Sequence, residues 1–329
     1  LGRLEQVGWI TKEEGIRVRN EPLKSVRPRV RRKAPWALDS VVSEAESVFG
    51  KGAVAEKTLT IQTTIDALLQ IVAERSVAQG LAEIEKKYGH AKGAEAALVA
   101  LDVKTGAVLA MVGGRKYGAS TFNRATLGKR QVGSTIKPLT WLYAFEDDPD
   151  LAPNSLILDE PIEREVNGEV WAPRNYDGEF VGEISMEDAL AQSRNIPAIL
   201  VAEGVGLISL AKRWNTIGLK SAKPYPSAAL GAFDASPMDL AAAYTVFPGM
   251  GRVVRPTLIR SVRLPDGEEG WDQKVSKQRV ASGRSSFLAT STLEAVMKNG
   301  TGMGASRYGL EGFVGGKTGT TDNGRDAWF

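Results

Sequence analysis

The 329-residue chain contains no cysteine and a single histidine, and these two shortages exclude more chemistry than its overall composition does. Without cysteine there is no thiol nucleophile, no thiolate zinc site and no disulfide. A Ser-His-Asp triad would need His90, and a histidine metal site would need two or three such residues. His90 stands in "KKYGHAKG", where we expect a solvated loop residue. Proton transfer would therefore fall to Lys, Asp, Glu or Ser, and we expect no metal and no cofactor.

Long apolar runs are missing as well. No stretch of about 20 apolar residues occurs, so no membrane span is predicted. The formal net charge of +3 points to neither an acidic nor a basic partner. The segment "SVRPRVRRKAPW" holds several basic residues between prolines, and we interpret it as an extended, solvated linker. Aromatic residues do not interleave with these charges, so no nucleic-acid partner is expected.

The first half of the chain predicts helices and a hairpin. Residues 1–20 read as the end of one helix, a turn at Gly8 and a second helix capped by Thr11 and Glu14. "KTLTIQTTID" predicts a strand, and residues 66–88 predict a helix. The apolar face expected for that helix consists of Ile65, Leu68, Leu69, Val72, Val77, Leu81 and Ile84.

The second half predicts mostly helices. A helical pattern dominates from Ser134 to about Gly218, with a capping box at Ser185 and Asp188, and Pro237 opens a later helix. "RPTLIRSVRLPDGEEG" reads as a strand, "SSFLATSTLEAVMKN" as a helix and "GFVGGKTGTT" as a strand. The order of strand, helices and strand favours an α+β domain whose antiparallel sheet is built from both ends of the chain.

One candidate for chemistry is Ser134-x-x-Lys137 in "RQVGSTIKPLTWLYAFE". Gly133 precedes the helical run, so Ser134 lies at a helix start and Lys137 one turn later on the same face. The helix dipole favours negative charge developing at Ser134. Apolar neighbours would desolvate Lys137 and lower its pKa from about 10.4, so that a neutral amine could accept the serine proton. A second Ser-x-x-Lys, at Ser209 and Lys212, fits an ordinary amphipathic helix and receives no role.

Two further motifs follow along the chain. Ser193-Arg194-Asn195 is the only Ser-x-Asn, and it lies in a tight connection between helices, where an N-cap is the competing interpretation. Lys-Thr-Gly occurs twice. The copy at 104–106 stands between two valine-rich runs and predicts a hairpin turn, with Gly106 supplying the positive φ angle. The copy at 317–319 lies between glycines, which allow a ligand to approach the backbone closely.

Taken in order, Ser-x-x-Lys, Ser-x-Asn and Lys-Thr-Gly resemble the motifs of penicillin-binding proteins and serine β-lactamases. The stretches "RQVGSTIKP", "NYDG", "SRNIPA", "LGAFDASPMDLAAAYTVF" and "GGKTGTTDNGRDAWF" are similar to the transpeptidase domain of class A (bifunctional) penicillin-binding proteins. This resemblance implies a penicillin-binding, serine β-lactamase-like fold over residues 58–329. Residues 1–57 would be the end of a glycosyltransferase domain and the linker.

The resemblance also implies a role for each motif residue. Ser134 would be the acylated nucleophile and Lys137 its general base. Ser193 would relay a proton to the leaving amine, and Asn195 would orient the substrate. The remaining roles are electrostatic control by Lys317, carboxylate binding by Thr318 and Thr320 on the strand with Gly319, and an oxyanion hole from the backbone N–H groups of Ser134 and Thr320.

The implied substrate is a peptidoglycan stem peptide ending in D-Ala-D-Ala, with β-lactams as mimics and cell-wall synthesis proteins as possible partners. The implied location is the extracytoplasmic face of a bacterial inner membrane, reached through an anchor outside this chain. Since the glycosyltransferase core and the last strand and helix of the family lie outside the sequence, glycan polymerisation is not assigned to it, and the sheet is expected to lack its C-terminal edge.

Three alternatives remain open. A β-lactamase would share the acylation machinery, but its usual Glu-x-x-Leu-Asn segment is not found between Asn195 and Lys317. A D,D-carboxypeptidase would use water instead of an amine at the same acyl-enzyme. A β-lactam sensor would be acylated without turning over.

Overall fold

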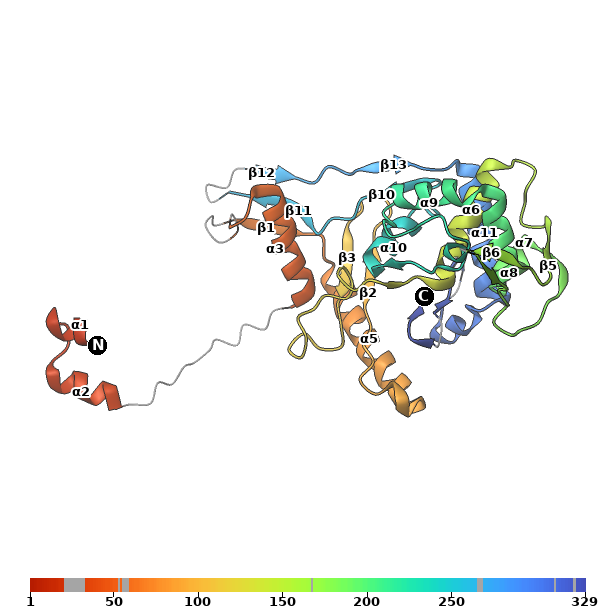
Figure 1. Ribbon diagram of the computed structural model, residues 1–329. Helices are drawn as coiled ribbons and strands as arrows, with labels where there is room; N and C mark the ends of the chain where they lie inside the picture. Colours follow the sequence, from red (N-terminus) through yellow and green to blue (C-terminus); the bar gives the residue numbers. More distant parts are fainter. Residues whose placement is uncertain are drawn as a thin grey trace. The chain divides into compact units, whose positions relative to one another are not determined.

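A computed structural model describes residues 1–20, 33–52, 54, 59–166, 168–264, 269–310, 312–321 and 324–329 of the chain (Figure 1). The chain divides into two compact units, Leu1–Lys33 and Ala34–Phe329. Residues 25–32 of the predicted basic linker lie outside the described residues, so the interpretation stays a prediction for them. Its end is not an extended, solvated segment, because Pro35 and Trp36 begin a helix and Trp36 is buried.

The first unit consists of α1 (Gly2–Gln6) and α2 (Lys12–Asn20). Gly8 lies between them with φ of +74°, in the left-handed region, as the predicted turn requires. The predicted capping box is confirmed. The Glu14 amide donates to Thr11 Oγ1 at 3.2 Å, and the Thr11 amide donates to Glu14 Oε2 at 2.8 Å.

The second unit contains the remaining elements. Its α-helices are α3 (Pro35–Phe49), α5 (Ala67–Lys87), α6 (Lys137–Asp147), α7 (Met186–Ala191), α8 (Asn195–Val205), α9 (Leu207–Thr216), α10 (Pro237–Tyr244) and α11 (Gly283–Asn299). Short 3-10 helices are η1 (Gly89–Ala91), η2 (Gly133–Ile136), η3 (Pro226–Leu230) and η4 (Met303–Tyr308). The predicted first positions of α5 and α10 are confirmed, since Asp66 caps α5 and Pro237 opens α10.

The strands pair in an antiparallel way. Their bounds are β1 (Thr60–Thr63), β2 (Leu98–Leu101), β3 (Val108–Val112), β4 (Arg130–Gln131), β5 (Leu156–Asp159), β6 (Arg164–Val166), β7 (Glu169–Trp171), β8 (Gly182–Ser185), β9 (Asp234–Ala235), β10 (Arg252–Val254), β11 (Ile259–Arg263), β12 (Glu269–Asp272), β13 (Lys277–Arg279), β14 (Gly319–Thr320) and β15 (Ala327–Trp328). One sheet has the order β1-β11-β12, and the other pairs are β2-β3, β4-β9, β5-β8, β6-β7, β10-β13 and β14-β15. Strands from distant parts of the chain therefore share sheets, and the expected α+β class is confirmed.

The hairpin of β2 and β3 is joined to β1 and β11 by side-chain and backbone contacts. The buried Thr64 hydroxyl lies 2.8 Å from the Val108 carbonyl oxygen and 3.0 Å from that of Thr257. A single parallel bridge between Ala107 and Thr257 supports the same junction. In the turn, Gly106 has φ of +76°, so the predicted hairpin is confirmed.

Helix α5 packs on a face that agrees with the predicted one at Val77 and Leu81 and differs from it elsewhere. Its buried residues are Gln70, Ala73, Val77 and Leu81, whereas Leu68, Leu69, Val72 and Ile84 are exposed. The cause is a polar anchor. Gln70 Nε2 donates to the Met111 carbonyl at 3.0 Å, and the Met111 amide donates to Gln70 Oε1 at 2.9 Å. These two bonds to β3 place Gln70 on the buried face of the helix. A prediction from apolar residues alone does not include a glutamine in that face.

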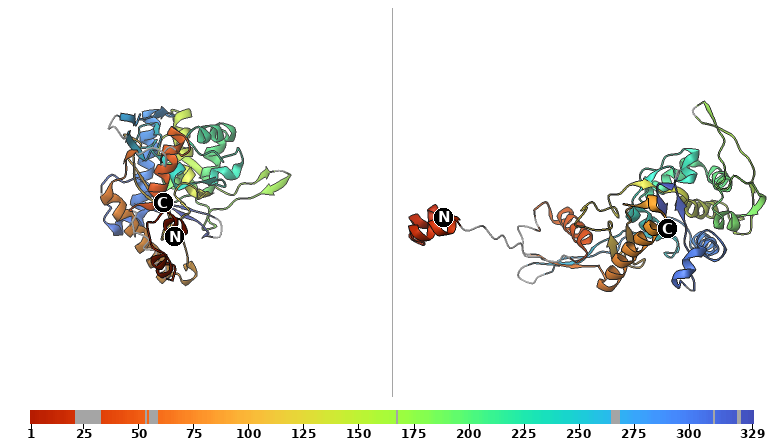
Figure 2. Two further views of the ribbon diagram at one scale, coloured as in Figure 1. Left: turned by 90° about the vertical axis from the view of Figure 1, so that its left-hand side faces the viewer. Right: turned by 90° about the horizontal axis from the view of Figure 1, so that it is seen from below.

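The long helical run predicted from Ser134 to about Gly218 was wrong in its middle, where β5 to β8 intervene. These strands have only three or four residues each, too few to establish a period of two. The β6–β7 hairpin projects from its surroundings (Figure 2), and Arg164 ties it to α8 through two 2.8 Å bonds to Glu203. The late predicted strand is also shorter than expected, since β14 begins only at Gly319.

Helix α6 forms the centre of the main core, beside α8 and α11 (Figure 1). Every residue from Lys137 to Phe145 is buried. Trp141 packs there with its Nε1 donating to the Met186 carbonyl at 2.9 Å. Each large apolar side chain buried in this way contributes roughly 1.5–3 kcal/mol, so the helix that carries Lys137 is held firmly.

Among the helices that the structure describes, none is long and apolar enough by itself to cross a bilayer. Helices α8 and α9, which meet at 90°, meet that criterion only when they are counted together.

Candidate active site

Ser134 and Lys137 occupy the junction of η2 and α6. Ser134 is half-buried in η2, and Lys137 is the first residue of α6 with 0% of its surface exposed. The main chain enters this junction through Gly133, whose φ of +53° few other residues adopt. No hydrogen bond joins the Ser134 hydroxyl to the Lys137 amine. The two side chains therefore share one turn, as predicted, while the amine is engaged elsewhere.

The Lys137 amine is held by the Ser193–Asn195 turn. Nζ lies 2.7 Å from the Ser193 carbonyl oxygen, 3.1 Å from the Arg194 carbonyl oxygen and 2.8 Å from Asn195 Oδ1. It also lies 3.4 Å from Ser193 Oγ. The first two predicted motifs thus meet at one nitrogen atom.

Ser193 connects this lysine to the third motif. The Lys317 amine, only 2% exposed, donates to Ser193 Oγ at 2.9 Å and to the Thr318 carbonyl at 2.8 Å. Ser193 itself has φ of +60°, a left-handed conformation that is uncommon outside glycine and asparagine. Such strain persists where surrounding contacts fix it, and it is frequent at functional sites.

Burial changes the acid–base properties of both lysines. The pKa of Lys137 lies well below its usual value, first because the amine is desolvated and then because Lys317 and Arg194 place positive charge nearby. Desolvation lowers the pKa of Lys317 to about 7. The lowered pKa of Lys137 favours the neutral amine, the form that can accept a proton, while Lys317 is balanced between its two forms near pH 7.

Strand β14 lies against the turn that carries Ser134. A Cβ atom on Gly319 would stand 2.7 Å from Thr135 Cγ2, and one on Gly133 would stand 2.7 Å from the Thr320 carbonyl oxygen. Only glycine permits these two close approaches. Thr318 Oγ1 bonds to the Thr301 hydroxyl at 2.6 Å, and Thr320 is exposed. Gly319 and Thr320 of β14 are thus brought against the turn that carries Ser134.

The duplicate motifs lie outside this cluster. Lys104 is exposed in the β2–β3 turn, where Thr105 Oγ1 bonds to Asp102 Oδ1 at 2.6 Å. Ser209 is half-buried on α9, and Lys212 is exposed. His90 is exposed in η1, as expected. In the described part of the chain, no group of three or more His, Asp or Glu side chains could hold a metal ion.

The family model described as "Penicillin binding protein transpeptidase domain" matches residues 96–327. The chain belongs to the penicillin-binding protein transpeptidase family. The resemblance drawn from the motifs is thereby confirmed, and the α+β fold is the one that this family shares.

Relatives of this family align along most of the chain. Penicillin-binding protein 1B of Escherichia coli (strain K12) is 31% identical over 302 residues, which cover 90% of this chain and 35% of the relative. Penicillin-binding protein 1A of Aquifex aeolicus is 29% identical over 406 aligned positions, covering 100% of this chain and 56% of the relative. The chain spans from about a third to somewhat over half of these curated relatives.

Solved structures of the family share the fold. The crystal structure of penicillin-binding protein 1A from Haemophilus influenzae has a TM-score of 0.82 at 22% identity, covering 98% of this chain and 67% of that one. The PonA1 protein from Mycobacterium tuberculosis in complex with penicillin V has a TM-score of 0.73 at 22% identity, covering 89% of this chain and 78% of that one.

Within this transpeptidase domain, the sequence motifs left out a polar network behind the Ser193–Asn195 turn, in which Arg194, Asp159 and Asn175 are buried and Asp177 is exposed. Arg194 pairs with Asp159 at 2.7 Å and with Asp177 at 2.6 Å. Asn175 Oδ1 accepts from the Asn195 amide at 2.7 Å. Asn175 and Asp177 belong to the "NYDG" stretch that contributed to the resemblance, but nothing in the sequence links Asp159 to them. The pairing of β5 with β8 places Asp159 opposite Gly182.

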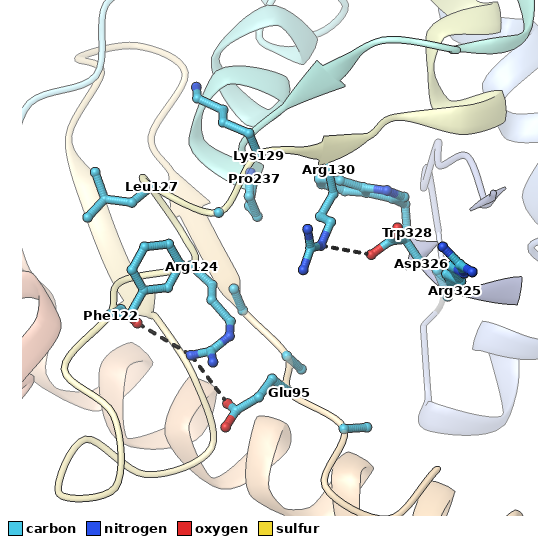
Figure 3. A pocket seen from close by; sticks show the side chains of 15 residues that line it. Glu95, Phe122, Arg124, Leu127, Lys129, Arg130, Pro237, Arg325, Asp326 and Trp328 are labelled. Atoms are coloured by element: carbon cyan, nitrogen blue, oxygen red, sulfur yellow. Dashed lines mark hydrogen bonds and ion pairs between the residues drawn. The ribbon is translucent and has the colours of Figure 1, made fainter. Parts of the chain in front are cut away.

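A groove of about 660 Å³ lies between the start of β2 and strand β15 (Figure 3). Arg124 pairs with Glu95 at 3.6 Å on one side, and Arg130 pairs with Asp326 at 3.3 Å on the other. None of the predicted site residues lines this groove. The acid–base cluster around Lys137 is therefore separate from it.

Proposed function

We propose that this domain is a serine D,D-transpeptidase, which cross-links peptidoglycan stem peptides through an acyl-enzyme on Ser134 and is inhibited by β-lactams. The observation that carries the proposal is the Lys137 amine. It is fully buried, has a lowered pKa, lies one turn from Ser134 and is joined through Ser193 to a second buried lysine. This arrangement provides a base for the nucleophile without histidine.

In the acylation step, Ser134 Oγ attacks the carbonyl carbon of the D-Ala-D-Ala peptide bond and gives its proton to the neutral Lys137 amine. The carbonyl oxygen becomes an oxyanion, for which the backbone N–H groups of Ser134 and Thr320 are the proposed donors. The C–N bond then breaks, and the departing D-Ala amine receives a proton from Lys137 through the Ser193 hydroxyl. The peptide remains bound to Ser134 as an ester.

In the second step, the amine of another stem peptide attacks the ester. That amine loses a proton to Lys137 as the ester bond breaks, and Ser134 Oγ takes a proton back. Asn195 is proposed to orient the substrate peptide, while Lys317, Thr318 and Thr320 are proposed to bind its terminal carboxylate. With water in place of the amine, the same chemistry would be that of a carboxypeptidase.

The wider setting is also proposed by relationship to penicillin-binding proteins 1A and 1B, which are longer than this chain. Residues 1–57 would end a glycosyltransferase domain of a bifunctional peptidoglycan synthase, and residues 58–329 would form the transpeptidase domain. Such a protein would act at the extracytoplasmic face of the inner membrane, anchored by a segment outside this chain and assisted by other cell-wall synthesis proteins.

The decisive experiment combines labelling with turnover. The protein is incubated with a fluorescent penicillin, and the modified residue is mapped by peptide mass spectrometry. It is then given a peptide ending in D-Ala-D-Ala together with an acceptor amine. We expect a label on Ser134 and an amine-linked product. Release of D-Ala without the cross-linked product would assign a carboxypeptidase, and labelling without any turnover of peptide would assign a sensor.

A further inference from the structure

The side chain of Arg194 is buried in a set of contacts of its own. It is 5% exposed, although its flanking residues are the half-buried Ser193 and Asn195. Its guanidinium donates from Nε to Asp159 Oδ2 at 2.7 Å, from Nη1 to Asp177 Oδ2 at 2.6 Å and from Nη2 to the Glu179 carbonyl. Three separate acceptors therefore fix one planar guanidinium. A lysine ammonium, which is a single point of charge, could not bond to all three acceptors at once.

We propose that Arg194 is a positioning residue for proton transfer: clamped by Asp159 and Asp177, it fixes the turn whose oxygen atoms orient the Lys137 amine. The inference rests on the proposed function, in which Lys137 takes the proton of Ser134. The Arg194 guanidinium bonds to Asp159, Asp177 and the Glu179 carbonyl and to no reacting atom, so the effect of this side chain passes through the turn to Lys137 and Ser193.

The backbone of the Ser193–Asn195 turn links the Arg194 side chain to Lys137. Two of the oxygens around Lys137 Nζ are main-chain carbonyls, those of Ser193 and Arg194, so their positions depend on the backbone. The turn is anchored to α7 by the Ser193 amide on the Leu190 carbonyl at 3.0 Å and the Arg194 amide on the Ala189 carbonyl at 2.9 Å. The Arg194 side chain holds it from a second direction while Ser193 stays at a positive φ.

Asn175 adds a second connection between the clamp and the site. Its Nδ2 donates to Asp159 Oδ1 at 2.7 Å, and its Oδ1 accepts from the amides of Asn195 at 2.7 Å and Ile196 at 3.3 Å. The carboxylate of Asp159, which is 0% exposed, is thus bonded to both Arg194 and Asn175. A shift of Asp159 would move the turn and the start of α8 together.

The charge of Arg194, like its contacts with the turn, favours Lys137 as a proton acceptor, because it lowers the pKa of that amine. Lys317 and Arg194 are the two cations near its amine, and both lower its pKa. Asp159 and Asp177 pair with Arg194. Without the guanidinium, one cation disappears and the Asp159 carboxylate loses its partner. Both changes raise the pKa of Lys137, so a higher pH is needed to keep it neutral.

The test compares Arg194→Met with the unmodified protein. The second-order rate constant of acylation by a fluorescent penicillin is measured from pH 5 to pH 10. We expect Arg194→Met to be slower by roughly 10- to 100-fold at neutral pH, and its rising limb to move to higher pH. A wild-type rate, or a loss equal at every pH with an unmoved midpoint, would overturn the proposal.

Two further variants keep the test decisive. Arg164→Met removes another arginine that makes two bonds to a carboxylate, that of Glu203, outside the site, and its rate and midpoint should match wild type. Arg194→Lys keeps the charge but not the fork, so we expect a slower rate with the midpoint near that of wild type. If Arg194→Met fails to fold, a wild-type rate in Arg194→Lys overturns the proposal, and a slower rate supports it.

Failure of this inference and failure of the proposed function look different. If the unmodified protein is never labelled on Ser134, the proposed function fails and takes the inference with it. If the unmodified protein is labelled and Arg194→Met reacts equally fast, only the role of Arg194 is lost.

Discussion

The Ser193 hydroxyl accepts a hydrogen bond from the Lys317 amine at 2.9 Å, although the two residues are 124 positions apart in the chain. The same oxygen lies 3.4 Å from the Lys137 amine. A hydroxyl that accepts from one lysine can direct its own proton toward another group. Ser193 is therefore placed between the two amines, where it can pass a proton without any histidine.

Ser134→Ala should abolish covalent labelling by penicillin, because the attacking oxygen is lost while the turn and the base remain. Intact-mass measurement after incubation with the antibiotic checks this. Ser209→Ala is the matched control, since Ser209 begins the other Ser-x-x-Lys and should leave labelling unchanged. A covalent adduct that persists in Ser134→Ala would refute the assignment of the nucleophile.

Lys317→Ala should slow acylation by roughly 100-fold or more, because it removes both the partner of Ser193 and the charge proposed to bind the substrate carboxylate. Lys104→Ala changes the other Lys-Thr-Gly copy, at an exposed hairpin turn. Its acylation rate should stay within about twofold of wild type, with stability changed by at most about 0.5 kcal/mol. Equal losses in the two variants would remove the distinction between the copies.

Acylation by penicillin should have a bell-shaped dependence on pH. The rate rises as Lys137, whose pKa is lowered by burial and nearby cations, loses its proton and becomes a base. It falls above pH 7, since burial lowers the pKa of Lys317 to about 7 and the charge that we propose to bind the carboxylate is lost there. Rate constants measured at constant ionic strength test this. A rate that keeps climbing to pH 9 would contradict the role given to Lys317.

The buried Lys317 should also make folding stability depend on pH. Because its pKa is about 7 in the folded protein and about 10.4 in an unfolded chain, the unfolded state binds more protons between these values. Stability from this residue is therefore lowest below pH 7 and rises with pH, by roughly 1.4 kcal/mol per unit, until about pH 10.4. Chemical denaturation should show the stability of wild type rising relative to that of Lys317→Met between pH 7 and pH 10. Parallel curves for the two proteins would argue against a buried, shifted lysine.

The penicilloyl-enzyme should be long-lived. Acylation needs a nucleophile, a base and an oxyanion site, whereas deacylation by water needs a further base directed at a water molecule. The sequence contains no Glu-x-x-Leu-Asn segment between Asn195 and Lys317 that would provide it. Intact mass and free penicilloate are followed together with excess antibiotic present. We expect one stable adduct, and continuous release of penicilloate would instead indicate a β-lactamase.

Much of the site could be predicted from the sequence because its residues stand in short motifs with local geometry. Ser134 and Lys137 are three apart at the start of a helix, a spacing that fixes their relation whatever the rest of the fold does. The two Lys-Thr-Gly copies could also be distinguished from the sequence. Valine-rich flanks predict a hairpin turn at the first copy, and flanking glycines predict that another group approaches the backbone closely at the second.

The supporting network could not be predicted, because it depends on contacts between distant segments. Asp159 ends a four-residue strand with no period to recognise, and its partner Arg194 was taken only as the middle of Ser-x-Asn. The packing of α5 was predicted only in part for a related reason: Gln70, a polar residue, is buried by bonds to β3. Whether a polar side chain is buried depends on a hydrogen-bond partner elsewhere in the chain. A local sequence pattern gives no information about that partner.

The glycines beneath Ser134 limit how the protein can change under selection by an antibiotic. Any side chain at Gly133 or Gly319 would collide with backbone or side-chain atoms of the neighbouring segment, at distances of 3.0 Å or less. Any missense change at either codon replaces glycine with a larger residue, so such variants should be depleted together with activity in a library grown with or without drug. Substitutions that reduce sensitivity to a β-lactam would then have to arise at positions that line the approach to Ser134. Side chains can vary there while the close contact between the segments of Gly133 and Gly319 is kept.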